Sequence, residues 1–230
     1  MRPLIANGPL SVGRRRSNIV VPWALDFVTE FYDGSQGVTA AGGFASAWAP
    51  VKGTHAVSQG TGAAQPGYVN GILTFDGTDD ILQSDAFTWN QPAQLFVCMS
   101  ITAYYSGTDR IYLGGLATDC TLYSPSAGNL ALYAGSPAAT AAGPAADTFA
   151  IFKVTWNGAS SGWSYNLNAG TTGNAGANNP GGLAFGDCPI AGGISGPSRM
   201  KGAARIDGVL NAAQSDQLIR AMGAYYGVSL

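Results

Sequence analysis

From residue 22 onward, the chain consists of short apolar runs that end in turns rich in Gly, Pro, Asn and Ser, spaced roughly 8–12 residues apart. Residues 95–101 form a continuous apolar run, long enough for one strand buried on both faces. Residues 148–156 are rich in the aromatic and β-branched residues that strands prefer. Residues 163–168 alternate between large apolar and small polar side chains, as a half-buried antiparallel strand does. The pattern predicts a mainly β protein, built as a sandwich or a barrel.

Two segments interrupt this pattern. Residues 135–147 and 168–182 consist mostly of Gly, Ala, Thr, Asn and Pro and lack apolar anchors. Low-complexity segments of this kind are typical of loops, so we expect no regular structure in either of them.

One helix is expected near the end of the sequence. Asn211 is followed three residues later by Gln214, which is a capping-box pattern. Gly227 supplies a left-handed stop. The apolar side chains that recur between them at helical spacing are Leu218, Met222 and Tyr225, with Ile219 and Tyr226 beside them. These signals predict one amphipathic helix over about 212–226.

Residues 1–21 hold four arginines and no acidic residue, and they show no regular period, so we expect an extended N-terminal arm outside a folded body at 22–230. The seven basic and 13 acidic residues that remain give this body a net charge of −6. A basic arm on an acidic body is typical of an interaction segment. The residues expected to carry attachment are Pro3, Leu4, Ile5, Arg14, Arg15, Arg16, Ile19 and Val20.

The three consecutive arginines favour an acidic protein partner, because guanidinium groups match carboxylates in a two-pronged geometry. Nucleic acid is a weaker alternative, since no aromatic residues are interleaved with the arginines. A solvated arm without a partner is the third alternative.

Several segments together resemble a known family. Residues 23–26 (WALD) match its opening W-x-L-D strand, and residues 44–48 (FASAW) match the strand that follows. Residues 65–82 contain a proline–tyrosine pair, an NG turn and the sequence FDGTDD, as its most specific hairpin does. Residues 199–202 and the C-terminal helix match its closing elements. The chain from about residue 22 to 230 thus resembles the concanavalin A-like, or laminin-G-like, jelly-roll domains of phage structural and bacterial surface proteins.

The resemblance implies two stacked antiparallel sheets in a jelly-roll sandwich. It implies little about function, because this fold serves lectins, hydrolases and inert scaffolds alike.

The catalytic inventory is small, with one histidine, His55, and one glutamate, Glu30. Glycoside hydrolases need two carboxylates about 5–9.5 Å apart. Hydrolases of the family that the chain resembles carry them as E-x-D-x-E or a close variant, which is absent here; residues 30–33 have the wrong spacing. Residues 158–162 match G-x-S-x-G, but strand-like segments on both sides indicate a hairpin turn rather than a nucleophile elbow. We therefore expect no enzyme.

Two binding sites are candidates. Asp76, Asp79 and Asp80 form the one acidic cluster, which is either a hairpin turn in which the carboxylates bind the backbone or the start of a Ca²⁺ site. No other cofactor is expected. Sugar rings stack on exposed aromatic side chains, although such residues also fill sandwich cores. The candidates for a glycan site are Trp89, Tyr104, Tyr105, Tyr123 and Trp163.

The cysteines and the hydropathy of the chain indicate the compartment in which the protein is made. Cys98 lies in an apolar run, and Cys120 and Cys188 are able to pair only if the fold brings them together, so three reduced thiols are expected. No stretch approaches ~18 consecutive apolar residues, so no membrane span is expected. No signal peptide is recognised either, which predicts synthesis in a cytoplasm.

Charged residues make up only 10% of the chain, against about 25% in ordinary soluble domains. Low charge, few catalytic groups and the arm favour a non-enzymatic structural protein of a phage-like virion. Its body would face outward, and its arm would bind capsid, portal or tail proteins. A homo-oligomer or symmetric array would multiply weak arm contacts into high avidity. The alternative function is a carbohydrate-binding adhesion module that recognises glycans.

Overall fold

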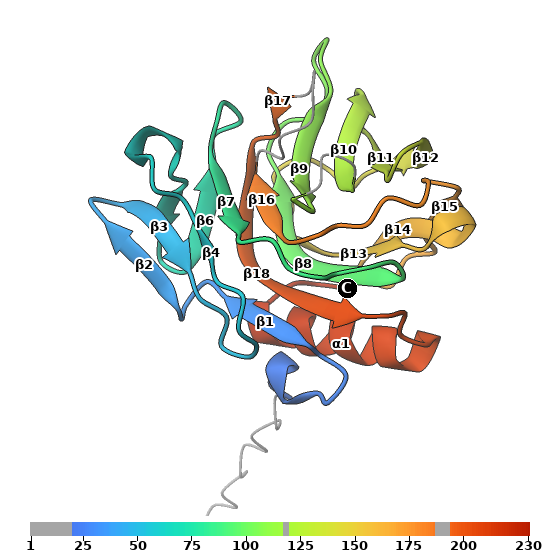
Figure 1. Ribbon diagram of the computed structural model, residues 1–230, viewed down its shortest axis with the longest axis horizontal. Coiled ribbons are helices and arrows are strands. Elements are labelled where there is room, and N and C mark those ends of the chain that lie inside the picture. Colours follow the sequence, from blue (N-terminus) through green and yellow to red (C-terminus); the bar gives the residue numbers. More distant parts are fainter. Residues whose placement is uncertain (1–19, 117–119, 187–193) are drawn as a thin grey trace, which may run out of the picture.

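The computed structural model describes residues 20–116, 120–186 and 194–230, which form a mainly β structure with one long helix (Figure 1). The helices are α1 (Ala212–Tyr226) and the short 3-10 turns η1 (Pro22–Ala24), η2 (Gly62–Ala64) and η3 (Gly158–Ser160). The strands are β1 (Glu30–Asp33), β2 (Val38–Ala41), β3 (Phe44–Trp48), β4 (Val57–Ser58), β5 (Gly67–Val69), β6 (Ile72–Phe75), β7 (Ile81–Ser84), β8 (Ala93–Ile101), β9 (Arg110–Gly114), β10 (Thr121–Ser126), β11 (Asn129–Tyr133), β12 (Pro137–Ala142), β13 (Ala150–Trp156), β14 (Ser161–Tyr165), β15 (Thr171–Gly173), β16 (Ala184–Gly186), β17 (Ile194–Ser195) and β18 (Ser198–Asp207).

The strands pair into one large sheet that folds over on itself. One part has the order β1–β18–β8–β13–β14–β15. The other has the order β12–β11–β10–β9–β16–β7–β4–β3–β2. β5 pairs with β3 and β6, and β6 pairs with the first residues of β18, so the pairing returns to the first part and nearly closes the sheet.

The predicted fold class is confirmed in its coarser form: the chain is mainly antiparallel β with one C-terminal helix. The two separate sheets of a jelly-roll sandwich are not confirmed, because β6 and β18 join the two parts into one sheet. Among the strands of the described residues, only β17 pairs parallel to its neighbour, β9.

The central strand β8 is buried on both faces, as its apolar run predicts. Leu95, Val97 and Met99 point into the larger core inside the folded sheet, where Trp48 and Phe152 also lie. The intervening side chains point outward, because successive residues of a strand face opposite sides. Phe96 and Cys98 pack there in a second apolar cluster beneath α1.

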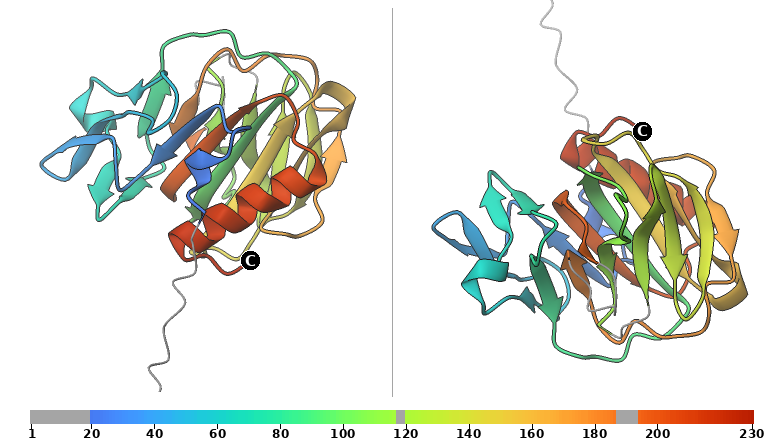
Figure 2. Two further views of the ribbon diagram at one scale, coloured as in Figure 1. Left: turned by 90° about the horizontal axis from the view of Figure 1, so that it is seen from below. Right: turned by 90° about the horizontal axis from the view of Figure 1, so that it is seen from above.

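Helix α1 lies across the outer face of the sheet, as Figure 2 shows from below. Asn211 accepts a hydrogen bond from the Gln214 N–H, and the Gln214 side chain accepts one from the Asn211 N–H. Gly227 ends the helix with a φ of 68°. The predicted capping box, stop and helix span are all confirmed. No helix among the described residues is long and apolar enough to cross a membrane.

The opening segment differs from the prediction. Pro22 begins the turn η1 instead of a strand, because its fixed φ and missing N–H suit the first position of a helical turn. The Trp23 ring packs 5.3 Å from the rings of both Phe31 and Tyr225, so it covers the junction between β1 and α1. From residue 20 onward, the first strand is β1, which pairs with β18.

The two segments predicted as loops each contain a strand, β12 and β15. Their small residues pair with the backbones of β11 and β14. Small residues have only a weak intrinsic preference for or against strands, so the neighbouring strands decide their conformation. The strand predicted at 163–168 ends earlier, at Tyr165, since Asn166 adopts a left-handed φ of 51°.

The hairpin expected within 65–82 is formed by β5 and β6. Asn70 and Gly71 both have positive φ, as the tight turn between two antiparallel strands requires. The acidic segment that follows leads from β6 to β7, which have different partners: β6 pairs with β5 and β18, whereas β7 pairs with β4 and β16. The hairpin turn predicted at Asp76, Asp79 and Asp80 is therefore wrong, because the strands on its two sides do not pair with each other.

Candidate functional site

A groove of about 360 Å³ lies on the outer face of β13, β14 and β15, beside the first turn of α1. This volume is within the range of ~300–1,000 Å³ that small-molecule sites occupy. Its polar lining consists mainly of the side chains of Gln94, Lys153, Thr155, Ser164, Thr172 and Ser215.

Strand alternation explains which side chains face the groove. Phe152 and Val154 point into the core, so Lys153 and Thr155 point outward. Lys153 lies opposite Ser164 in the register of β13 and β14, which places both on one face. Gly162 forms part of the floor; a Cβ there would lie 2.5 Å from the Thr171 carbonyl oxygen, so a glycine is needed for β15 to approach β14 this closely.

The inner wall of the groove is held rigidly by Gln94. Its Nε2 donates to the Thr155 hydroxyl at 2.9 Å, and its Oε1 accepts from the Leu210 N–H at 2.8 Å. Because Gln94 and Thr155 are buried and bonded to each other, this wall is fixed before any ligand arrives.

The electrostatics of the groove favour negative charge. Lys153 is the one charged side chain among its lining residues. Ala212, the first residue of α1, also lines it, and a helix begins with the positive end of its dipole. Hydroxyl, amide and ammonium groups together are able to bind a polar ligand that carries an acidic group.

The tryptophans predicted to bind glycans lie inside the protein. Trp89 is buried, and so is Trp163, whose Nε1 donates to the Ala139 carbonyl at 2.6 Å. Trp163 lines the groove, but its indole belongs to the core cluster. Neither ring presents a face to solvent for stacking.

The three predicted tyrosines lie outside the groove; Tyr104 and Tyr105 are half-buried, and Tyr123 is buried. The Tyr104 hydroxyl donates to the Pro144 carbonyl at 2.5 Å. The Tyr105 N–H donates to the Ser124 hydroxyl. Their part in glycan binding stays a prediction.

The acidic cluster comes together as predicted. Carboxylate oxygens of Asp76, Asp79 and Asp80 lie within 4.8 Å of one another. Asp80 is buried and accepts a hydrogen bond from the Asp76 N–H at 2.8 Å, while Asp76 accepts one from the Thr78 N–H, as in a turn. One oxygen from each carboxylate supplies three of the 6–8 oxygens that Ca²⁺ takes, so the Ca²⁺ site stays a prediction.

We expect Asp80→Asn to stabilise the protein by roughly 1–3 kcal/mol at pH 8 in metal-free buffer. Burial, together with the charges of Asp76 and Asp79, raises the pKa of Asp80 to about 6. The hydrogen bond from the Asp76 N–H lowers this pKa, but its effect is smaller than the combined effect of burial and charge. Because the pKa of Asp80 is raised, its own contribution to stability is most favourable below the ordinary value near 3.8 and is lost as the pH rises through about 6. Thermal melts from pH 4 to pH 8 measure this.

The variant should lose this pH dependence, since an amide does not ionise. Added Ca²⁺ tests the metal prediction in the same melts. If the cluster binds Ca²⁺, the ion stabilises the wild type at pH 8 and has less effect on Asp80→Asn. A wild type that does not respond to millimolar Ca²⁺ argues against the metal site.

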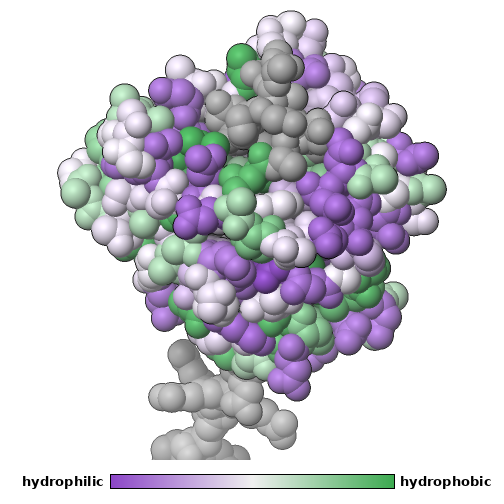
Figure 3. All heavy atoms as spheres, viewed as in Figure 1, coloured by the Kyte–Doolittle hydropathy of each residue, from purple (hydrophilic) through white to green (hydrophobic). Residues whose placement is uncertain are grey.

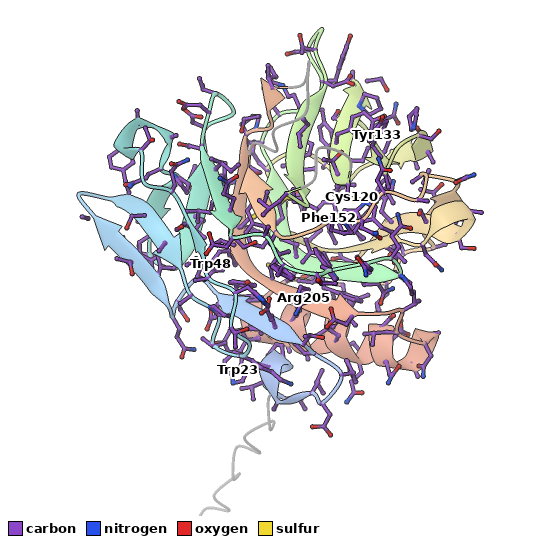
Figure 4. All side chains as sticks on the ribbon, in the orientation of Figure 1. Trp23, Trp48, Cys120, Tyr133, Phe152 and Arg205 are labelled. Atoms are coloured by element: carbon purple, nitrogen blue, oxygen red, sulfur yellow. The ribbon has the colours of Figure 1, made fainter. Side chains whose placement is uncertain are left out.

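A second polar cluster joins β1 to β18 around the one glutamate, Glu30. Arg205, labelled beside β1 in Figure 4, donates from Nε to Glu30 Oε2 at 3.0 Å. The N–H groups of Thr54 and His55 donate to Glu30 Oε1, and His55 Nδ1 lies 2.5 Å from the same oxygen. Tyr32 donates its hydroxyl to Glu30 and to the His55 carbonyl.

Burial would raise the pKa of Glu30, but the hydrogen bonds from Thr54 and His55 and the Arg205 charge outweigh it and hold this pKa below its ordinary value. The guanidinium of Arg205 also lies over the rings of Phe87 and Trp89 and binds Asp207. This network fixes the His55 ring, which stacks 3.8 Å from Phe87.

Sequence reasoning did not find this network. It considered His55 only as part of the small catalytic inventory and Glu30 only as one of a pair of carboxylates. The one available signal was that the chain has a single histidine and a single glutamate.

Most of the predicted arm lies outside the described residues, namely Pro3, Leu4, Ile5, Arg14, Arg15, Arg16 and Ile19. Val20 is described and is exposed.

Cys188 also lies outside the described residues, so its pairing with Cys120 stays open. The Cys120 thiol lies 2.9 Å from the Asn178 carbonyl oxygen. Cys98 is a buried free thiol whose pKa burial raises to about 12, against a small opposing effect of Lys201.

No protein-family model and no curated protein matches the chain in sequence. Solved structures match it in shape. A sialidase of Trypanosoma rangeli has a TM-score of 0.64 at 12% identity, over 86% of this chain and 33% of that chain. The receptor-binding domain of botulinum neurotoxin type G has a TM-score of 0.55 at 7% identity, over 85% and 51%. The binding domain of botulinum neurotoxin DC, solved with a sialyl ligand, has a TM-score of 0.59 at 9% identity, over 86% and 52%.

The chain therefore spans a third of the sialidase and about half of the toxin domains. At these identities the similarity shows the fold, and the predicted β architecture agrees with it. The similar structures named above are a sialidase and two toxin binding domains.

Proposed function

We propose that the chain is a carbohydrate-binding module and that the groove beside α1 is its glycan site. The observation that carries this proposal is the composition of the groove, which lines a small-molecule-sized volume with hydroxyl and amide groups and one ammonium. Sugars present many hydroxyls that donate and accept hydrogen bonds, and this lining offers the matching partners.

A sugar that carries a carboxylate fits this groove best. Lys153 supplies a positive charge, and the start of α1 adds the positive end of a helix dipole. The similar folds lend support, because the sialidase was solved with sialic acid and the neurotoxin DC domain with a sialyl ligand.

The contacts of His55 hold its ring in the network around Glu30. A histidine that activates a nucleophile must lie within hydrogen-bond reach of it. Across residues 20–116, 120–186 and 194–230, the structure shows His55 bonded to Glu30 and to no Ser, Thr or Cys side chain. The Glu30 carboxylate in turn is occupied by five donors.

The virion role stays a prediction from the sequence. The residues on which it depends belong to the arm, which the structure describes only from Val20 onward.

A glycan array probed with the full chain tests the proposal, with sialylated and desialylated forms of the same glycans side by side. We expect binding to acidic glycans and a loss of roughly 10–100-fold in affinity for Lys153→Gln, because a hydrogen bond to a charged group contributes about 1.5–3 kcal/mol. Titration calorimetry with the best glycan measures the loss.

The matched control is Arg220→Gln. It removes the same charge from an exposed position of α1 outside the groove, so it should bind as the wild type does. A flat array, or equal losses in the two variants, would contradict the proposed site.

A further inference from the structure

Strand β2 forms a free edge of the large sheet. It pairs with β3 on one side, and no other strand within the described parts of the chain lies along its second side. Figures 1 and 2 show the β2–β3 hairpin projecting from the body, away from α1. A free edge carries unpaired N–H and C=O groups and is a template for another strand.

This edge lacks the features that normally keep edges apart. β2 consists of Val38, Thr39, Ala40 and Ala41, which are small and uncharged, and the last three are exposed. The bulge in the hairpin lies on β3, because Thr39 faces Ala47 and Ala40 faces Ala45, so β2 itself stays regular. Natural edges are instead protected by charges, prolines or bulges of their own.

The surrounding surface is also uncharged. Residues 34–51 contain no Asp, Glu, Lys or Arg, although the body as a whole is acidic. Figure 3 shows mostly pale atoms at the left margin, where this hairpin projects. Phe44 lies on the adjacent strand and is 52% exposed.

The hydrogen bonds to β3 establish which groups of β2 are free. The Ala49 N–H donates to the Gly37 carbonyl at 2.8 Å, and the Ser46 hydroxyl donates to the Thr39 carbonyl. Backbone groups of an antiparallel strand alternate in direction, so those of Gly37 and Thr39 face β3. The N–H and C=O groups of Val38 and Ala40 therefore face outward.

We propose that β2 pairs antiparallel with β2 of a second copy of this chain, about a two-fold axis at Thr39. Val38 of each copy then exchanges hydrogen bonds with Ala40 of the other, and the two Thr39 side chains lie opposite each other, a favourable cross-strand pair. In this register Ala41 lies opposite Gly37 of the second copy. Phe44 lies opposite Ala41 in the β2–β3 hairpin, so the two side chains share one face. Because Gly37 has no side chain, the Phe44 ring covers the position where Ala41 meets Gly37 of the second copy.

The distribution of charge over the surface favours a second copy of this chain over an unrelated partner. Two acidic bodies repel each other over most of their surfaces, and the repulsion is least where both are uncharged. An uncharged edge offers nothing to attract a charged partner, whereas two identical strands complement each other about a two-fold axis.

Disulfide trapping tests the register. In the full chain, Thr39→Cys places two thiols at a non-hydrogen-bonded pair about 4.5 Å apart between Cα atoms, within the range that a disulfide spans. Ala41→Cys is the matched control: it lies on the same exposed face, but its Cα atoms are about 14 Å apart in this register. We expect a mild thiol oxidant to give covalent dimers of Thr39→Cys, with Ala41→Cys at the level of the wild type.

Sedimentation equilibrium tests the association itself. The wild type should form dimers as its concentration rises, and Thr39→Lys should raise the dimer dissociation constant by at least about tenfold, because like charges then lie directly opposite. Circular dichroism checks that this exposed substitution leaves the fold intact. A wild type that stays monomeric, or equal crosslinking at positions 39 and 41, overturns the proposal, even if an unrelated extended peptide binds this edge.

Discussion

Replacing Glu30 with glutamine should lower the free energy of unfolding by about 3–5 kcal/mol, as breaking one partner of a buried ion pair does. Both carboxylate oxygens of Glu30 accept hydrogen bonds, on one side from Thr54 and His55 and on the other from Arg205. An amide accepts through one atom only. Its NH₂ group would face donors on one of these sides and leave the buried Arg205 with only the exposed carboxylate of Asp207 as a counter-charge.

Urea denaturation of Glu30→Gln and of Asp85→Asn, which removes the same charge from an exposed site, separates this effect from net charge. The Asp85→Asn change should stay within about 0.5 kcal/mol of the wild type. Similar stabilities for the two variants would show that the network around Arg205 contributes little.

The dependence of the free energy of unfolding on pH in acid should also differ between the wild type and Glu30→Gln. Because the pKa of Glu30 is lowered in the folded protein, its contribution is present above the ordinary value of 4.5 and disappears as the pH falls through the lowered folded value. Wild-type stability should therefore fall more steeply below pH 4.5 than that of Glu30→Gln.

Gly34→Ala should destabilise the protein by about 1–3 kcal/mol or more, for a purely steric reason. A Cβ at Gly34 would lie 2.1 Å from the Gly71 carbonyl oxygen and 2.8 Å from the Lys201 carbonyl oxygen. Both atoms belong to backbone, in the β5–β6 turn and in β18, so no side chain is able to rotate away. The alanine would push apart the strands that join the two parts of the sheet.

Gly60→Ala is the matched control, because a Cβ there has no neighbour within 4 Å and its backbone is not left-handed. Thermal unfolding of both variants measures the difference. Equal midpoints would mean that the backbones around residue 34 move apart at little cost.

Local signals predicted some elements well. The capping residue, the apolar stripe and Gly227 lie within one short segment, so α1 was predictable to its ends. The apolar run of β8 predicted burial on both faces for the same reason. β12 was missed because small residues carry no strand signal of their own, and only the backbone of β11 makes that segment a strand.

The groove could not be predicted, since its polar residues come from segments that only the fold brings together. Gln94 belongs to β8, Lys153 to β13 and Ser215 to α1. Trp163 illustrates a conflict between two predictions. The alternation of its strand placed the ring inside, whereas its aromatic character suggested a sugar platform, and the structure agrees with the alternation.

The position of β18 bears on how the chain reaches its native state. This strand pairs with β1, β6 and β8, and its Arg205 meets a carboxylate 175 residues earlier in the sequence. A protein dominated by contacts between distant residues folds slowly, because long loops must close before these contacts form. On the ribosome, the early strands keep exposed pairing edges until β18 has been synthesised, and aggregation is most favoured during that interval.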